Sequence, residues 1–263
     1  MDYTGRWKLL QHASVRYFAP IMLHLHSIGP GVVHIAQAGS QPGATSGTPV
    51  RDPEAVQTNT NITTGIVNDT PLTGTANITL SLRSWATGEA MQSWHIYGPV
   101  PAYSSRNFST APAKEYLGLH PAETVFLTAS ATIKSAEPAE GTETEAEAEA
   151  ESVAAAAADV ILTSHHYPSK MKAATLRDPK IKLEFSEAGH GQQLSVTVSC
   201  SAPAPHVFLD PGTLLGHFGD NGMLLLPSQP RTLVFDDVGE AGVTMARLKA
   251  EVVARSPWST RHH

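Results

Sequence analysis

Residues Thr75–Arg83 have the sequence TANITLSLR, in which apolar and polar side chains alternate without a break. The apolar set is Ala76, Ile78, Leu80 and Leu82, and every residue between them is polar. Because successive side chains of a β-strand point to opposite faces, this period of two predicts a strand with one buried face and one solvent face.

The same alternation recurs along the chain. It is clear in three further stretches, Thr124–Ile133, Ile181–Phe185 and Leu194–Ser201. It is weaker in Ile21–Ser27, Val32–Gln37, Gln92–Tyr97, Val160–Thr163, Val207–Leu209, Leu224–Leu226 and Thr232–Phe235. Short strands separated by Gly, Pro, Asn and Asp turns are typical of antiparallel β-sandwiches, so the predicted fold class is mainly β, with two such sandwiches.

The N-terminal segment has a helical rather than a strand period. From Gly5 to Phe18, Trp7, Leu10 and Tyr17 fall on one side of a helix, and Pro20 ends it. A single helix of about four turns cannot bury an apolar stripe by itself. The stripe therefore predicts a packing partner, either in the following residues or outside this chain.

The predicted domain organisation follows from these patterns. Residues 1–19 form the helix, 20–169 a first sandwich, 170–254 a second sandwich and 255–263 a tail. The first sandwich is expected to carry two disordered insertions, at 37–53 and 135–159. The first insertion is rich in Gly, Ser and Pro, and the second has too little apolar bulk to offset the entropy of ordering it.

Composition excludes several classes of protein. The 263 residues carry a formal charge of −6, but seven glutamates lie between Glu137 and Glu151, so the rest is close to neutral. A nucleic-acid partner is not expected, since it requires a basic face. No apolar run is long enough for a membrane span, and the N-terminus has no apolar core of a signal peptide.

Few residues suggest catalysis. Asp210 and Asp220 are the carboxylates outside the acidic run that we considered as a glycosidase pair, but both lie in turn sequences, LDPG and GDNG. The single cysteine, Cys200, is in phase with buried positions and is expected to be a small core residue. No catalytic residue and no cofactor is therefore predicted.

Histidines provide the one alternative for a metal. His24 and His26 share a face of a predicted strand, and His34 could lie across a hairpin, which would give three zinc ligands. No acidic or cysteine ligand lies near them in the sequence, so no metal is predicted. Loss of bound metal on mutation of these histidines would test the alternative.

Four Asn-x-Ser/Thr sequons are candidate N-glycosylation sites: Asn61, Asn68, Asn77 and Asn107. Asn77 is on the polar face of the strand at Thr75–Arg83, where a glycan would be accommodated. These triplets favour a secretory origin.

Three segments together resemble the C-terminal part of the β-mannosidases of glycoside hydrolase family 2. They are DYTGRWKLL through Phe18-Ala19-Pro20, the stretch Thr64–Trp85, and the run APHVFLD, GHFGDNGMLLLP and PRTLVF within 204–235. The chain departs from the family at Phe208, usually Trp, at Gly219, usually Ser, and at Met223, usually aromatic. The order and spacing of the segments support the resemblance.

The resemblance implies that both sandwiches are immunoglobulin-like and that the N-terminal helix is the last helix of a catalytic (β/α)8 barrel. In this family two glutamates on barrel strands hydrolyse terminal non-reducing β-D-mannosides with retention. No residue here matches either glutamate motif, so this chain is expected to be inactive alone. Trp7, Leu10 and Tyr17 would pack on the missing barrel, and the complete enzyme would be secreted or lysosomal or vacuolar.

A stand-alone immunoglobulin-like module that binds a glycan or a protein remains the alternative. A glycan platform needs exposed aromatic residues in a row. Trp85, Trp94 and Tyr97 are the candidate cluster, but Trp94 and Tyr97 have opposite parity on their strand.

Overall fold

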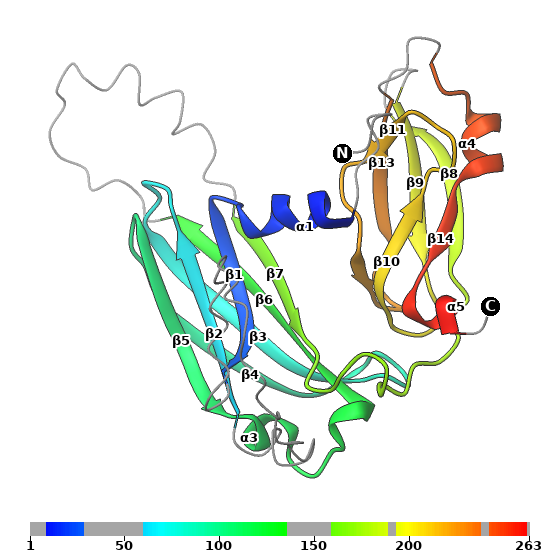
Figure 1. Cartoon of the computed structure of the whole chain (residues 1–263). Helices are drawn as coiled ribbons and strands as arrows, with labels where there is room; N and C mark the ends of the chain where they lie inside the picture. The colour runs from blue at the N-terminus through cyan, green and yellow to red at the C-terminus, as the bar shows by residue number, and fades with distance from the viewer. Residues whose placement is uncertain (1–8, 29–59, 136–158, 189–192, 238–241, 262–263) are drawn as a thin grey trace, which may run out of the picture.

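The computed structural model describes residues 9–28, 60–135, 159–188, 193–237 and 242–261. Two antiparallel β-sandwiches lie side by side, with helix α1 (Leu9–Tyr17) between them (Figure 1). The prediction of a mainly antiparallel β chain is confirmed. The predicted helix Gly5–Phe18 is observed from Leu9 onward, and residues before Leu9 lie outside the described part.

The first sandwich consists of a three-stranded and a four-stranded sheet. One sheet has the order β1-β2-β5 and the other β4-β3-β6-β7. Their bounds are β1 Ile21–Ile28, β2 Asn61–Asn68, β3 Gly74–Ser84, β4 Ala90–Val100, β5 Ser104–Pro112, β6 Val125–Ser135 and β7 Val160–His166. The short helices α3 (Ala113–Leu117) and η1 (Ala122–Thr124) connect β5 to β6.

Strand β3 has the buried face that its alternation predicts. Ile78 and Leu80 are fully buried, and they pack with Ile133 of β6 and Ile62 and Ile66 of β2 in one core. β3 pairs along its whole length with β6, in which Leu127–Ile133 alternate as predicted. Phe126, which the alternation places on the solvent face, is instead fully buried. The opposite faces of these strands carry the intervening Thr, Ser and Asn side chains, of which Ser81 is buried.

The second sandwich is also formed by a four-stranded and a three-stranded sheet, ordered β11-β13-β9-β8 and β12-β10-β14. Its strands are β8 Lys182–Ala188, β9 Gln193–Ser199, β10 Ala204–Asp210, β11 Gly216–Phe218, β12 Met223–Leu225, β13 Arg231–Asp237 and β14 Val253–Arg255. Val196, Leu209 and Phe235 belong to its core. Helix α4 (Met245–Glu251) adds Leu248 to that core, and the side chain of Thr244, directly before the helix, caps it by accepting from the Arg247 amide.

The C-terminal boundary differs from the prediction. The expected tail at 255–263 begins with ordered structure, since Arg255 ends β14 and Pro257–Arg261 form helix α5. The Ser256 amide donates to the Ser259 hydroxyl and the Ser259 amide donates to the Ser256 hydroxyl, which fixes the start of α5. In the sequence, the two serines are too short a pattern to distinguish helix α5 from a polar tail.

The two predicted insertions lie almost entirely outside the described residues, as does the predicted strand Val32–Gln37. At the edges of the second insertion, Ser135 is still part of β6 and Asp159 borders β7. Residues 167–181 connect the two sandwiches.

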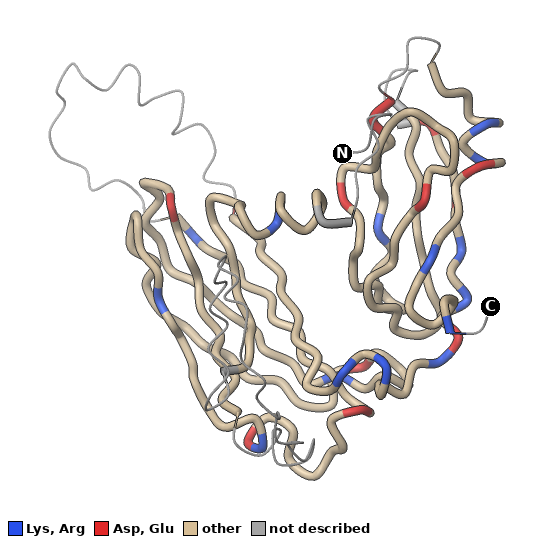
Figure 2. Tube along the Cα trace, in the orientation of Figure 1, with Lys and Arg blue, Asp and Glu red and all other residues tan. Residues whose placement is uncertain are grey.

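Charged residues of both signs are interspersed along both sandwiches and the connection (Figure 2). Among the described helices none is long and apolar enough to cross a membrane.

Candidate functional site at the junction of the two sandwiches

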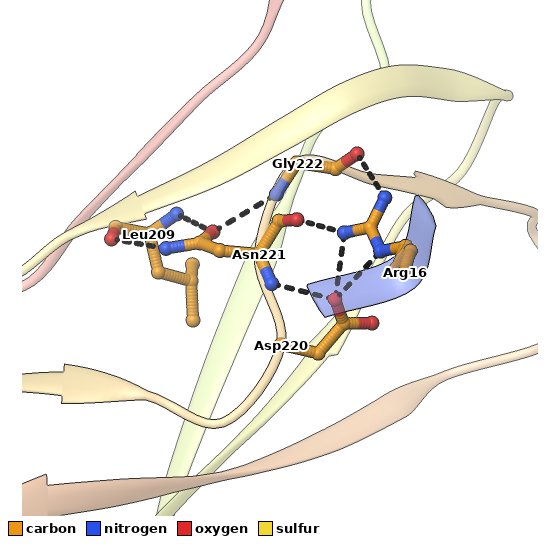
Figure 3. A network of polar contacts seen from close by, with 5 residues as sticks. All are labelled: Arg16, Leu209, Asp220, Asn221 and Gly222. Carbon is orange, nitrogen blue, oxygen red and sulfur yellow. Dashed lines mark hydrogen bonds and ion pairs between the residues drawn. The ribbon is translucent and has the colours of Figure 1, made fainter. Parts of the chain in front are cut away.

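Helix α1 is attached to the second sandwich through Arg16. The Arg16 Nε and Nη2 atoms donate to Asp220 Oδ1, at 3.1 and 2.6 Å, and Nη1 donates to the Gly222 carbonyl at 3.3 Å. Nη2 also donates to the Asn221 carbonyl. Figure 3 shows the guanidinium group facing this turn, so one side chain joins residues that are about 200 positions apart.

The turn that receives Arg16 is itself fixed by the buried Asn221. Its Oδ1 accepts from the Leu209 amide at 2.7 Å and its Nδ2 donates to the Leu209 carbonyl at 3.0 Å (Figure 3). Gly222 adopts φ +67°, a conformation that glycine reaches without strain. The turn is therefore anchored to β10 by contacts that do not involve Arg16.

His12 adds a second contact on the same side of α1. Its side chain is buried and its ring lies edge-on to Phe208, with the ring centroids 6.4 Å apart. Burial lowers the pKa of His12, with a smaller opposing effect from the Asp220 carboxylate. The contacts of the described helix residues with the second sandwich therefore come from two polar side chains, Arg16 and His12.

The other side of α1 is open to solvent. Tyr17 is 72% exposed, and its neighbours Val15 and Phe18 are 52% and 85% exposed. Trp7 and the side chain of Leu10 lie outside the described residues. No described part of the chain covers Val15, Tyr17 or Phe18.

A second contact between the sandwiches is aromatic. Trp85 stacks on Phe126 with ring centroids 4.1 Å apart, and Tyr167 lies 5.5 Å from Trp85. Leu226 of the second sandwich and Ala174 of the connection complete this cluster. Burial of these apolar side chains stabilises the contact among the first sandwich, the connection and the second sandwich.

Two histidines from different sandwiches border this cluster. His165 of β7 and His206 of β10 each lie against Tyr167, and their own ring centroids are 6.3 Å apart. His206 has φ +49° at the irregular part of β10, between Ala204 and Val207. A bulge of this kind redirects a side chain, here toward the junction. Sequence reasoning singled out neither His206 nor Arg16, since no local pattern marks either residue.

We expect acid to weaken this junction. Burial lowers the pKa of His165 to about 4, and the nearby His206, Arg16 and His166 act in the same direction. In the unfolded chain a histidine has a pKa of about 6.5. Below that pH the unfolded chain therefore binds more protons than the folded chain. The free energy of unfolding should therefore fall as the pH drops from about 6.5 toward 4.

Urea unfolding of the wild type and of His165→Gln at pH 7 and pH 4.5 measures this effect. The variant should lose less stability on acidification than the wild type. His120→Gln, at an exposed histidine, is the matched control and should behave as the wild type. An equal acid effect in His165→Gln and the wild type would contradict the assignment.

The two aspartates considered for catalysis are structural in this fold. Asp210 Oδ1 accepts from the Gly212 amide and its Oδ2 binds Arg255 Nε at 3.1 Å, while Asp220 holds Arg16. Asp210 ends β10 directly before the turn at Pro211–Leu214, and Asp220 lies in the bend after β11, close to what their sequences predict. Cys200 is buried, and burial raises the pKa of its thiol to about 11, which suits a core residue and not a nucleophile.

The histidines considered as metal ligands are partly brought together. The Nδ1 atoms of His24 and His26 are 3.0 Å apart on β1, whereas His34 lies outside the described residues. Across the described part of the chain, no group of three or more His, Cys, Asp or Glu side chains is placed to hold a metal ion.

The aromatic residues considered for a glycan platform are separated by the fold. Trp85 is buried in the junction cluster, and Trp94 is half-buried in a T-shaped contact with Tyr116. Tyr97 is 66% exposed. The three side chains do not form an exposed row.

Comparison with known proteins supports the resemblance described above. Residues 176–260 match the family model Ig_mannosidase, described as an Ig-fold domain. This range contains the second sandwich, so an immunoglobulin-like domain of the kind associated with family 2 β-mannosidase-type enzymes is confirmed there. A search among curated proteins found no match.

Two solved structures are similar to this chain at low sequence identity. A β-D-mannosidase from Dictyoglomus thermophilum has a TM-score of 0.53 and 12% identity, with 75% of this chain and 20% of that chain covered. An exo-chitosanase from Amycolatopsis orientalis has a TM-score of 0.42 and 15% identity, with 74% and 24% covered. The chain thus spans about a fifth of the length of the β-mannosidase, and the likeness concerns the fold alone.

Proposed function

We propose that this chain is the non-catalytic C-terminal β-sandwich portion of a β-mannosidase. The complete enzyme would hydrolyse terminal non-reducing β-D-mannose residues with retention, using two glutamates in a catalytic barrel outside this chain. The match of residues 176–260 to the mannosidase Ig-fold domain supports this assignment, as does the likeness of the two-sandwich fold to a β-mannosidase. The Asp210 and Asp220 carboxylates are engaged by arginines, so they do not offer a substitute pair.

The proposed partner of α1 is that barrel. The observation that carries this proposal is the asymmetry of the helix: Arg16 and His12 are held by the second sandwich while Tyr17 and Phe18 are exposed. An apolar surface beside a fixed polar contact is typical of an interface. Trp7 and Leu10 continue the same apolar stripe in the sequence and would pack on the barrel with Tyr17.

The complete enzyme would be secreted or located in the lysosome or vacuole. Support for this location comes from the family resemblance and from the sequons that the fold leaves exposed, Asn61, Asn77 and Asn107.

Sequencing the transcript upstream of the Met1 codon, followed by assay of the products, tests the proposal. We expect the reading frame to continue through a barrel, the long product to hydrolyse p-nitrophenyl β-D-mannoside, and residues 1–263 alone to be inactive. Hydrolysis by residues 1–263 alone would overturn the proposed role. An upstream stop codon would instead favour the stand-alone module, whose glycan and protein ligands should then be sought.

A further inference from the structure

The four sequons have different surroundings in the fold, and Asn68 is the exception among them. Its side chain is fully buried. Nδ2 donates to the Leu72 and Pro101 carbonyls, each at 2.8 Å, and Oδ1 accepts from the amide and the hydroxyl of Thr70. Two donors and two acceptor positions are the whole capacity of a carboxamide, so Asn68 has no free position. A glycan on Nδ2 would remove one of these hydrogen bonds, and the buried side chain leaves no space for a sugar beside it.

Asn77 has the opposite environment. It lies on the solvent face of β3, between the buried Ala76 and Ile78, and its side chain is exposed. Its partner in the antiparallel pair with β4 is Tyr97, which is 66% exposed. Directly paired residues have Cβ atoms about 4.5–5.5 Å apart, so the Asn77 and Tyr97 side chains leave the sheet next to each other on its solvent face.

This pairing places the Tyr97 side chain where a sugar on Asn77 can pack against it. A pyranose ring presents C–H groups on one face, and an exposed tyrosine ring offers an apolar surface that its own strand does not cover. Asn61 and Asn107, on β2 and β5, are also exposed. They lie on the other sheet of the first sandwich.

We propose that Asn61, Asn77 and Asn107 are N-glycosylation sites, that Tyr97 packs on the glycan at Asn77, and that Asn68 is a structural carboxamide which stays unmodified. The inference rests on the proposed secretory location of the parent enzyme. In the reaction, Nδ2 of the asparagine attacks C1 of an oligosaccharide carried on a polyprenyl diphosphate. The C1–N bond forms as the C1–O bond breaks, the diphosphate leaves with the electron pair, and the Nδ2 proton passes to a base of the transferase.

The test is to express the full chain behind a secretion leader in a eukaryotic host. Secreted protein is treated with peptide-N-glycosidase in ¹⁸O-labelled water, and labelled aspartate at each sequon is measured by mass spectrometry. We expect label at the three exposed sites and none at Asn68. Label at Asn68 in secreted, folded molecules, or no label at Asn77, would overturn the proposal. Because the leader directs the chain into the secretory pathway, these outcomes do not depend on where the natural protein is located.

A second measurement tests the role of Tyr97. Enzymatic removal of glycans should lower the melting temperature of the wild type by about 2 °C more than that of Tyr97→Ala, since only the wild type loses the ring contact. Tyr103→Ala is the matched control, because Tyr103 is also exposed but lies off the β3–β4 pair. An equal loss in the wild type and Tyr97→Ala would overturn the packing role and leave the sites themselves supported.

Discussion

Replacing Trp85 with alanine should lower the free energy of unfolding by about 3–5 kcal/mol, the range for a large buried aromatic residue. Trp85 is 1% exposed and is stacked on Phe126 and close to Tyr167. Its removal leaves a cavity at the point where the first sandwich, the connection and Leu226 of the second sandwich meet. We therefore also expect the sandwiches to become less firmly attached to each other.

Urea unfolding followed by far-UV circular dichroism measures the first effect, because this signal does not depend on the tryptophan itself. Faster proteolysis within residues 167–181 reports the second effect. Tyr103→Ala removes an aromatic ring that is 71% exposed, and it should change stability by no more than about 0.5 kcal/mol. A loss below about 1 kcal/mol in Trp85→Ala would mean that the cluster does not join the sandwiches.

The second large effect is expected for Asn221→Ala, at about 3 kcal/mol of lost stability. The substitution leaves the buried amide and carbonyl of Leu209 without their side-chain partner, and each unsatisfied group costs about 1–3 kcal/mol. The turn would also relax, and its carbonyls would no longer be placed for Arg16. Hydrogen exchange in α1 should accelerate as a result.

The control for Asn221→Ala, with both variants made in a bacterial host that adds no N-glycans, is Asn77→Ala, which removes an exposed carboxamide and should change stability by no more than about 0.5 kcal/mol. Asn221→Asp provides a sharper comparison. It keeps the acceptor for the Leu209 amide but places a charge against the Leu209 carbonyl, so it should also destabilise the second sandwich. Wild-type stability in both Asn221 variants would exclude the proposed role of this side chain.

The strands with a regular period could be predicted from the sequence. β3, β6 and β9 each bury their alternating apolar residues, and a strand with one apolar face carries this alternation in its own residues. Phe126 of β6 is buried on the other face because a separate segment packs there, which the alternation does not show. The turns at Asp210 and Asp220 were predictable for the same reason, because Asp, Asn and Gly fit turn geometry locally. The motifs in residues 204–235 also indicated the family that the Ig-fold match supports.

Strands β2 and β5 could not be predicted in this way. β2 is buried on both faces for most of its length, so its residues do not alternate. β5 is largely polar and pairs only with β2 in the described sheet. Both are strands because of hydrogen bonds to partners elsewhere in the chain, which no local pattern contains.

The sequence by itself therefore determined the fold class, the turns and the likeness of the second sandwich to the mannosidase Ig-fold domain, because periodicity and turn chemistry are properties of neighbouring residues. Only the tertiary structure decided which residues form the junction. The contact of Arg16 with Asp220, the meeting of His165 with His206 and the saturation of Asn68 each depend on the approach of separate segments. Such contacts arise from how the sheets pack, and that packing has no signature in any single stretch of sequence.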